Sequence, residues 1–157
     1  MRETLFNWLQ TEIHGARCLD LFAGSGALGL EALSRGASAL LAVEQNRGAA
    51  QRLRENIRLL NEQAAAEILQ RDAISLLARP PPVPFGIAFL DPPFAQELLA
   101  VACRLLEENH WLAPEAWVYL EQDAARPWPE FPPNWSLYRE GRAGQSVQRL
   151  LRRSSTS

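Results

Sequence analysis

The residues best suited to carry out chemistry are Asp91-Pro92-Pro93-Phe94, which directly follow the apolar run 85–90. That run is typical of a buried strand, so the four residues should stand at the edge of a sheet. The Asp91 carboxylate can accept a hydrogen bond from an N–H group. The prolines have a fixed φ and no N–H, so they can hold a backbone carbonyl outward as a second acceptor. With the Phe94 ring free to stack on a planar base, this set favours methylation of an amino group on such a base.

A glycine-rich turn precedes this motif in the chain. Gly24-Ser25-Gly26-Ala-Leu-Gly29 matches the pattern Gly-x-Gly-x-x-Gly between an expected strand and an expected helix. Glycines let the backbone approach a ligand closely and adopt positive φ. Glu44 follows the next expected strand, where a carboxylate can bind both hydroxyls of a ribose. The pattern predicts an adenosine-bearing cofactor, and by itself leaves both a dinucleotide and S-adenosylmethionine open.

Two features favour S-adenosylmethionine. Asp20, just before the glycine turn, suits a cationic amino-acid group and would repel a pyrophosphate. Hydride transfer also has no obvious use for the Asp-Pro-Pro-Phe motif, so a nicotinamide-dependent oxidoreductase is the weaker alternative. A hydrolase is a third hypothesis, because Ser25, Asp91 and His110 occur in the order of a catalytic triad. It is disfavoured because the turn follows the first strand and His110 follows a helix end.

Alternating strands and helices must position these residues. Their alternation predicts an α/β fold with a mostly parallel seven-stranded sheet, covered by helices on both faces. A Pro-rich loop then leads to an antiparallel hairpin at 135–139 and 146–150. Ligands of such sheets bind beyond the carboxyl ends of the strands. Four acidic residues lie at or near these expected ends: Asp20, Glu44, Asp72 and Asp91.

We expect one domain over residues 1–153, followed by a disordered tail at 154–157. Along the third helix, Leu53, Ile57 and Leu60 should point inward. The expected helices cover 2–13, 26–35, 47–61, 73–78 and 96–108, and the expected parallel strands cover 17–22, 39–43, 66–70, 85–90 and 116–120.

Composition excludes several functions. The 157 residues contain no lysine, which excludes a lysine-dependent phosphate loop, a Schiff-base lysine and the kinase ATP lysine. No apolar run approaches the ~20 residues that a membrane span needs. Cys18 and Cys103 show no zinc spacing with the two histidines, so we expect no metal, two reduced buried thiols, a cytoplasmic location and a monomer. The net charge of −2 weighs mildly against nucleic acid, but the arginines at 139–153 form either a solvated face or a phosphate-contacting edge.

Four stretches together carry a family resemblance: 2–9, 18–35, 91–94 and 134–137. Through them the chain resembles the class I S-adenosylmethionine-dependent methyltransferases, and more closely the bacterial enzymes that methylate the exocyclic amine of a guanine in small-subunit ribosomal RNA. The resemblance implies a Rossmann-like fold and a partner that is ribosomal RNA or the assembled small subunit. DNA adenine or cytosine and protein glutamine remain alternative substrates of the same chemistry, and a non-catalytic cofactor-binding module remains an alternative of another kind.

The resemblance also implies roles for individual residues. One group should hold the target base: Asp91, Pro92, Pro93 and Phe94. A second group should bind the cofactor, from its methionine end through its ribose to its adenine: Thr4, Asp20, Phe22, Ala23, Gly24, Ser25, Gly26, Glu44, Gln45, Asp72 and Ala73.

One departure from the family concerns the amino-terminal end. Family members usually carry a basic segment of a few dozen residues before the helix that begins here at Arg2, and that segment is thought to help hold RNA. The printed sequence begins at this helix. We expect either that the sequence starts later than those of its relatives or that other residues hold the RNA.

Overall fold

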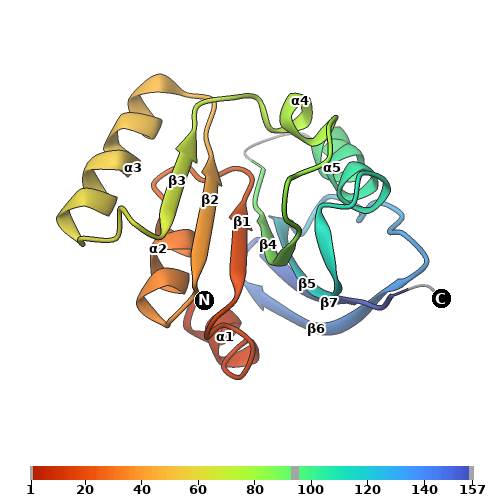
Figure 1. Ribbon diagram of the computed structural model, residues 1–157. Coiled ribbons are helices and arrows are strands. Elements are labelled where there is room, and N and C mark those ends of the chain that lie inside the picture. The colour runs from red at the N-terminus through yellow and green to blue at the C-terminus, as the bar shows by residue number, and fades with distance from the viewer. Residues whose placement is uncertain (1, 93–95, 156–157) are drawn as a thin grey trace.

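A seven-stranded sheet organises the chain. The computed structural model describes residues 2–92 and 96–155 (Figure 1). The strands lie in the order β3-β2-β1-β4-β5-β7-β6. In chain order, the elements are α1 (Arg2–Trp8), β1 (Arg17–Asp20), α2 (Ala27–Ser34), β2 (Ala39–Val43), α3 (Arg47–Leu59), β3 (Ala66–Leu69), α4 (Ala73–Leu77), β4 (Phe85–Leu90), α5 (Gln96–Glu108), β5 (Leu112–Asp123), β6 (Trp135–Ala143) and β7 (Ser146–Arg153).

The strand order creates the place where a ligand can bind. β1 pairs in parallel with β2 on one side and with β4 on the other, while β5 pairs in parallel with β4. The chain therefore winds outward from β1 in one direction and then restarts at β4 in the other. At such a reversal the loops after the two central strands diverge and leave a crevice. β7 then pairs antiparallel with both β5 and β6, which confirms the predicted hairpin at the end of the sheet.

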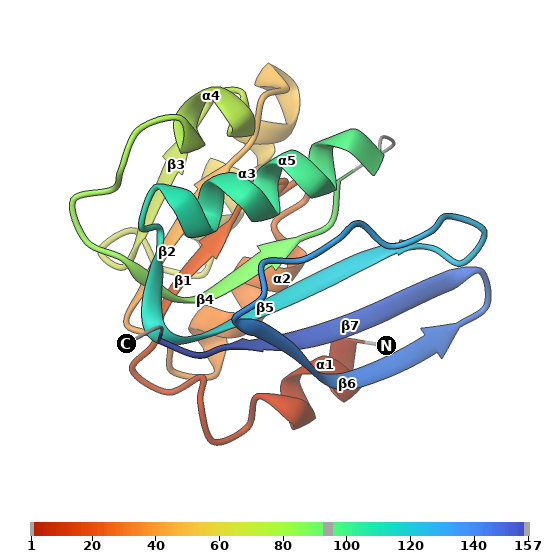
Figure 2. The same cartoon turned by 90° about the vertical axis from the view of Figure 1, so that its right-hand side faces the viewer.

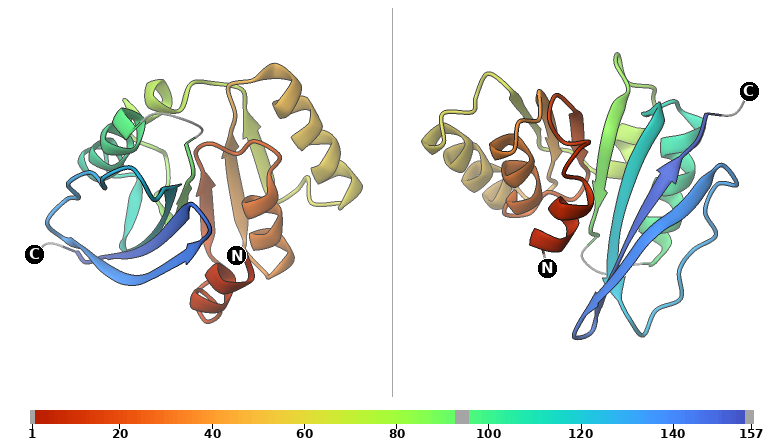
Figure 3. Two further views of the ribbon diagram at one scale, coloured as in Figure 1. Left: turned by 180° about the vertical axis from the view of Figure 1, so that it is seen from behind. Right: turned by 90° about the horizontal axis from the view of Figure 1, so that it is seen from below.

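Two hydrophobic cores lie on the two faces of the sheet, because successive side chains of a strand point to opposite faces. Leu19 and Leu90 pack on the face that α4 and α5 cover. Cys18 and Phe89 pack on the other face, against α1, α2 and α3. Figure 2 shows α4 and α5 on one side of the sheet and α1 on the other, and Figure 3 shows α1 next to α2. The prediction of helices on both faces is confirmed.

Some boundaries differ from the prediction. α1 ends at Trp8, and the chain continues in tight turns to Gly15. Leu9 and Ile13 are still buried, so the apolar spacing indicated the buried face correctly but not the length of the helix. Leu60 was predicted to point inward; this is wrong, because α3 ends at Leu59 and Leu60 is 56% exposed.

Gly26 couples the glycine turn to the core beneath it. Its φ is +84°, and a Cβ at this position would collide with Leu53 Cδ1, a buried atom of α3. Gly26→Ala therefore combines left-handed strain of about 1–2 kcal/mol with overpacking of about 1–3 kcal/mol. At ~2–4 °C per kcal/mol for a chain of this size, we expect the midpoint of thermal unfolding to fall by roughly 4–20 °C.

Gly144 provides a matched control for this prediction. Its φ is +60°, but a Cβ there meets nothing within 4 Å. Gly144→Ala should therefore show the strain alone and lower the unfolding temperature by less than half as much. Equal losses in the two variants would show that the contact with Leu53 is unimportant.

Candidate active site

A cavity of about 450 Å³ opens at the carboxyl ends of β1, β2 and β4, where the strand order reverses. Its walls come from the turn after β1, the residues after β2, the first residues of α4 and the residue after β4. The cavity is lined by ten of the residues expected at a site: Asp20, Phe22, Ala23, Gly24, Ser25, Glu44, Gln45, Asp72, Ala73 and Asp91.

The glycine turn and Glu44 hold each other in place. The backbone amide of Gly24, whose φ is +55°, donates a hydrogen bond of 2.7 Å to Glu44 Oε1. The amide of Asn46 donates a second, of 2.8 Å, to Oε2. The carboxylate is thus fixed by two backbone groups at the mouth of the cavity. A carboxylate keeps free acceptor positions after two such bonds, so Glu44 can still accept from a pair of hydroxyls.

Asp20 is an acid buried beneath the cavity. It ends β1 and is only 2% exposed. Burial, followed by the charge of Asp91, raises the pKa of Asp20 to about 7, although backbone amides of Gly29 and Phe22 act in the opposite direction. Among the described residues, Asp20 forms no ion pair. A cationic ligand group would supply the missing positive charge, since an opposite charge nearby favours the ionised form.

Asp72 has a structural role as well as a place in the cavity. It is the N-cap of α4, and its Oδ2 accepts bonds from the Ser75 amide (2.9 Å) and the Ser75 hydroxyl (3.1 Å). Such caps are common where a helix begins. Both bonds use Oδ2, so Oδ1 remains available to the cavity.

Asp91 stands where β4 ends, beside both the cavity and β5. The residue is exposed to solvent. Partial loss of hydration of the carboxyl group, followed by the charge of Glu121, raises the pKa of Asp91 to about 6. Pro92 is half-buried. Pro93 and Phe94, the other two residues expected to hold the base, lie outside the described residues.

Three described residues of the expected site do not line the cavity: Pro92, which follows Asp91, Gly26 and Thr4. Gly26 is buried behind the turn, and Thr4 is exposed on α1. Residues that were not expected complete the wall, among them the exposed Arg71, which precedes Asp72. Its position after a strand end was the only signal for it in the sequence. The remaining lining residues are Leu21, Ala27, Leu28, Val43, Ala49 and Leu98.

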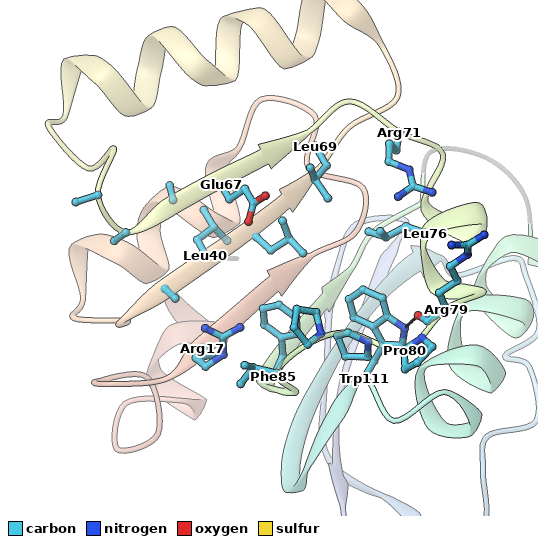
Figure 4. A pocket seen from close by; sticks show the side chains of 18 residues that line it. Arg17, Leu40, Glu67, Leu69, Arg71, Leu76, Arg79, Pro80, Phe85 and Trp111 are labelled. Carbon is cyan, nitrogen blue, oxygen red and sulfur yellow. Dashed lines mark hydrogen bonds between the residues drawn. The ribbon is translucent and has the colours of Figure 1, made fainter.

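A second hollow, of about 500 Å³, lies on the sheet face that α4 and α5 cover only in part (Figure 4). It is larger than the cavity at the strand ends but chemically plainer. Apolar residues, among them Phe85 and Trp111, form most of its wall, and Glu67 is its one acid. Trp111 Nε1 donates to the Arg79 carbonyl at 2.9 Å, which is a structural bond. The acids that could perform chemistry line the other cavity.

The structure argues against the hydrolase hypothesis. His110 precedes the start of β5, at the end of the sheet where Phe85 pairs with Leu112. Asp91 stands at the opposite end of β4, about 20 Å away at ~3.3 Å per residue. His110 and Asp91 therefore cannot form the base–acid pair of a triad.

No group of three or more His, Cys, Asp or Glu side chains among the described residues could hold a metal ion. In the same part of the chain, none of the helices has the length and apolar character needed to cross a membrane.

The sheet order, the glycine turn and the cavity at the reversal define a Rossmann-like fold of the class I methyltransferases. A magnesium protoporphyrin IX methyltransferase from Synechocystis PCC 6803 shares this fold at 15% identity, with a TM-score of 0.74 over 98% of this chain and 78% of that chain.

Much closer relatives exist. A family profile with the description "Conserved hypothetical protein 95" matches residues 1–152, and this chain belongs to that family. Ribosomal RNA small subunit methyltransferase D of Escherichia coli K12 is 47% identical over 155 residues, which cover 99% of this chain and 77% of that protein. Its counterpart in Haemophilus influenzae is 41% identical over 152 residues, 96% of this chain and 78% of that protein. The solved structure of yhhF from E. coli, named as a methyltransferase, has a TM-score of 0.95 at 47% identity, covering 99% of this chain and 86% of that chain.

Proposed function

We propose that this chain transfers a methyl group from S-adenosylmethionine to the exocyclic amine of a guanine in small-subunit ribosomal RNA. The observation that carries the proposal is the position of Asp91: its carboxylate lies at the rim of a cavity whose other acids suit this cofactor. The relatives named above act on small-subunit ribosomal RNA, which supports the choice of substrate.

The residues present fit the cofactor. When bound, S-adenosylmethionine supplies an electrophilic methyl group on a sulfonium. Asp20 offers a buried negative charge to the ammonium of its methionine part, and the glycine turn allows close approach of the backbone. The fixed carboxylate of Glu44 suits the two ribose hydroxyls. Gln45, Asp72 and Ala73 line the wall where the adenine would lie. Thr4, which lies outside the wall, is the weakest member of the proposed set.

Asp91 would act on the amine that receives the methyl group. The nitrogen lone pair of a guanine amine is delocalised into the ring, so the amine is a poor nucleophile. Hydrogen bonds from its N–H groups to the Asp91 carboxylate and the Pro92 carbonyl favour the pyramidal geometry, in which the lone pair is free to attack. The C–N bond then forms as the C–S bond breaks, and the amine loses one proton, which Asp91 can accept. Orientation of the two reactants supplies up to ~7–11 kcal/mol.

The base has to leave its stack to reach this site, which costs a few kcal/mol. Phe94 would return about 1–3 kcal/mol by stacking on it. Its position lies outside the described residues, so this part of the proposal rests on the sequence motif.

Labelled methyl transfer tests the proposed function. The protein and S-adenosylmethionine with a labelled methyl group are mixed with one candidate substrate in each reaction. The candidates are small subunits, naked small-subunit RNA, DNA and release factors. The label should enter the RNA and appear as N2-methylguanosine after digestion. Label in DNA or protein, or stabilisation by NAD but not by S-adenosylhomocysteine, would refute the proposal.

Cofactor binding should depend on pH through Asp20. Its pKa is raised to about 7 in the free protein, and a bound ammonium would lower it, so binding releases a proton near and below that pH. The affinity for S-adenosylhomocysteine should fall by up to about tenfold per pH unit below pH ~6.5. Calorimetry in two buffers with different ionisation enthalpies measures the released proton. An affinity that stays constant between pH ~5.5 and ~8 would contradict this role of Asp20.

A further inference from the structure

A second carboxylate stands beside Asp91 on the next strand. β4 and β5 are parallel, and Leu90 pairs with Leu120, so Asp91 and Glu121 follow side by side at the same level of the sheet. Two residues earlier, Phe89 and Tyr119 contact each other on the face that α1 covers, with ring centroids 6.3 Å apart. Because side chains alternate along a strand, Asp91 and Glu121 project toward this same face.

Glu121 is held in a fixed position. The Tyr119 hydroxyl donates a hydrogen bond of 2.6 Å to Oε1, and the Ser146 hydroxyl donates one of 3.1 Å to Oε2. Gln148 in turn donates to the Ser146 hydroxyl at 2.9 Å. Tyr119 and Gln148 are buried, at 2% and 4% exposure. Burial and the neighbouring Glu121 hold the pKa of Tyr119 well above its usual range, so the phenol remains a donor.

This arrangement places two like charges together. Glu121 forms no ion pair with any residue in the described part of the chain, and its charge contributes to the raised pKa of Asp91. A glutamine would satisfy Tyr119 and Ser146 without this repulsion. The carboxylate therefore costs stability in the free protein, and a ligand with two adjacent N–H donors would relieve that cost.

The Watson–Crick edge of guanine offers such a pair of donors, the N2 amine and the neighbouring N1–H. Adenine presents an acceptor at N1 instead, which a carboxylate would repel. Resting on the proposed function, we propose that Glu121 determines specificity for guanine: it accepts the N1–H bond, while Asp91 holds the N2 amine. Tyr119 and Ser146 are positioning residues that aim the Glu121 carboxylate.

A base analogue tests this contact. 2-Aminopurine keeps the exocyclic amine of guanine but has an acceptor at N1 and no oxygen at C6, so the part of the preference that depends on Glu121 reports the N1 contact. A short RNA is made with either base at the position that labelled transfer identifies, and kcat/KM is measured for both. Wild-type protein should prefer guanine by about 100-fold or more, because a site built around a hydrogen bond rejects an analogue that lacks the donor.

Glu121→Gln should reduce this preference to within about tenfold, because the glutamine amide can donate to the N1 acceptor. The turnover of guanine should fall at the same time, whereas the affinity for S-adenosylhomocysteine should not change. Tyr119→Phe removes only the hydroxyl that orients Glu121 and should weaken the preference partially. Glu140→Gln, an exposed glutamate of β6, is the matched control and should keep the preference of the wild type.

The outcomes separate the two proposals. A wild-type protein that methylates no guanine-containing RNA would refute the proposed function itself. A wild-type protein that methylates guanine and 2-aminopurine equally well would overturn the role of Glu121 alone, whether or not any variant folds. Unchanged base preference in folded Glu121→Gln would overturn it in the same way.

Discussion

Replacing Asp91 with alanine should abolish detectable methyl transfer while the protein still binds its cofactor. The carboxylate lies at the rim of the cavity and, in the proposed mechanism, acts only on the amine that receives the methyl group. Removal of one group that stabilises a transition state typically costs about 10²–10³-fold in kcat. We expect a loss of at least that size in single-turnover assays. The affinity for S-adenosylhomocysteine should stay within about threefold in calorimetry, because Asp91 is not proposed to touch the cofactor.

Two companion variants show whether the charge is what matters. Asp91→Asn keeps the shape and one carbonyl acceptor, so it should retain more activity than alanine but less than wild type. Asp123→Ala removes an exposed aspartate at the end of β5, and should have no effect on transfer. Among the described residues, its side chain accepts a hydrogen bond from the Ala125 amide alone. Near-normal turnover by Asp91→Ala would show that the proposed mechanism is wrong.

Asp20→Asn should stabilise the cofactor-free protein at pH ~8 and at the same time weaken cofactor binding by about 100-fold. In the folded protein the pKa of Asp20 is raised from 3.8 to about 7. As the pH rises, the unfolded chain therefore loses this proton at a lower pH than the folded protein does. The stability linked to this proton is complete below pH ~3.8 and is lost as the pH rises through ~7. Asparagine avoids burying a charge, so the free energy of unfolding should rise by on the order of 2–4 kcal/mol at pH ~8.

The pH dependence distinguishes this effect from ordinary repacking. Near pH 5 the folded protein still holds this proton while the unfolded chain has lost it, so the stability advantage of Asp20→Asn should be less than half of its value near pH 8. Near pH 8 the variant should unfold roughly 5–15 °C higher, at ~2–4 °C per kcal/mol for a chain of this size. Its affinity for S-adenosylhomocysteine should fall by about 100-fold, because the ammonium loses its counter-charge. A gain in stability that is the same at both pH values would contradict the assignment of a buried, titrating carboxyl group.

Much of the candidate site could be predicted because it follows from local patterns. A short apolar run gives a strand, parallel strands end at one edge, and acids that follow those runs must gather there. This rule predicts Asp20, Glu44 and Asp91 at one edge of the sheet, and in the structure all three line one cavity. The hairpin could also be predicted, since the alternation of helices and strands stops where it begins.

Other features depend on long-range packing, and no local pattern reports them. The length of α1 could not be read from its apolar spacing, because the turns after Trp8 bury Leu9 and Ile13 equally well. The environment of Glu121 depends on β7 lying beside β5, which brings Ser146 to its carboxylate. That pairing joins segments that are distant in sequence, so in the sequence Glu121 is only an acid that directly follows the expected strand 116–120.

The placement of β7 between β5 and β6 has a consequence for how the molecule assembles. β5 and β6 both precede β7 in the chain, yet β5 does not pair with β6, because β7 lies between them. During synthesis, the edges of β5 and β6 that pair with β7 stay unpaired until β7 has been made. Unpaired strand edges can pair with other chains and so promote aggregation. The cavity for the cofactor needs only the earlier strands, whereas the support of Glu121 needs β7. The nascent protein would thus form its cofactor pocket before the carboxylate that we propose to select the base is held in position.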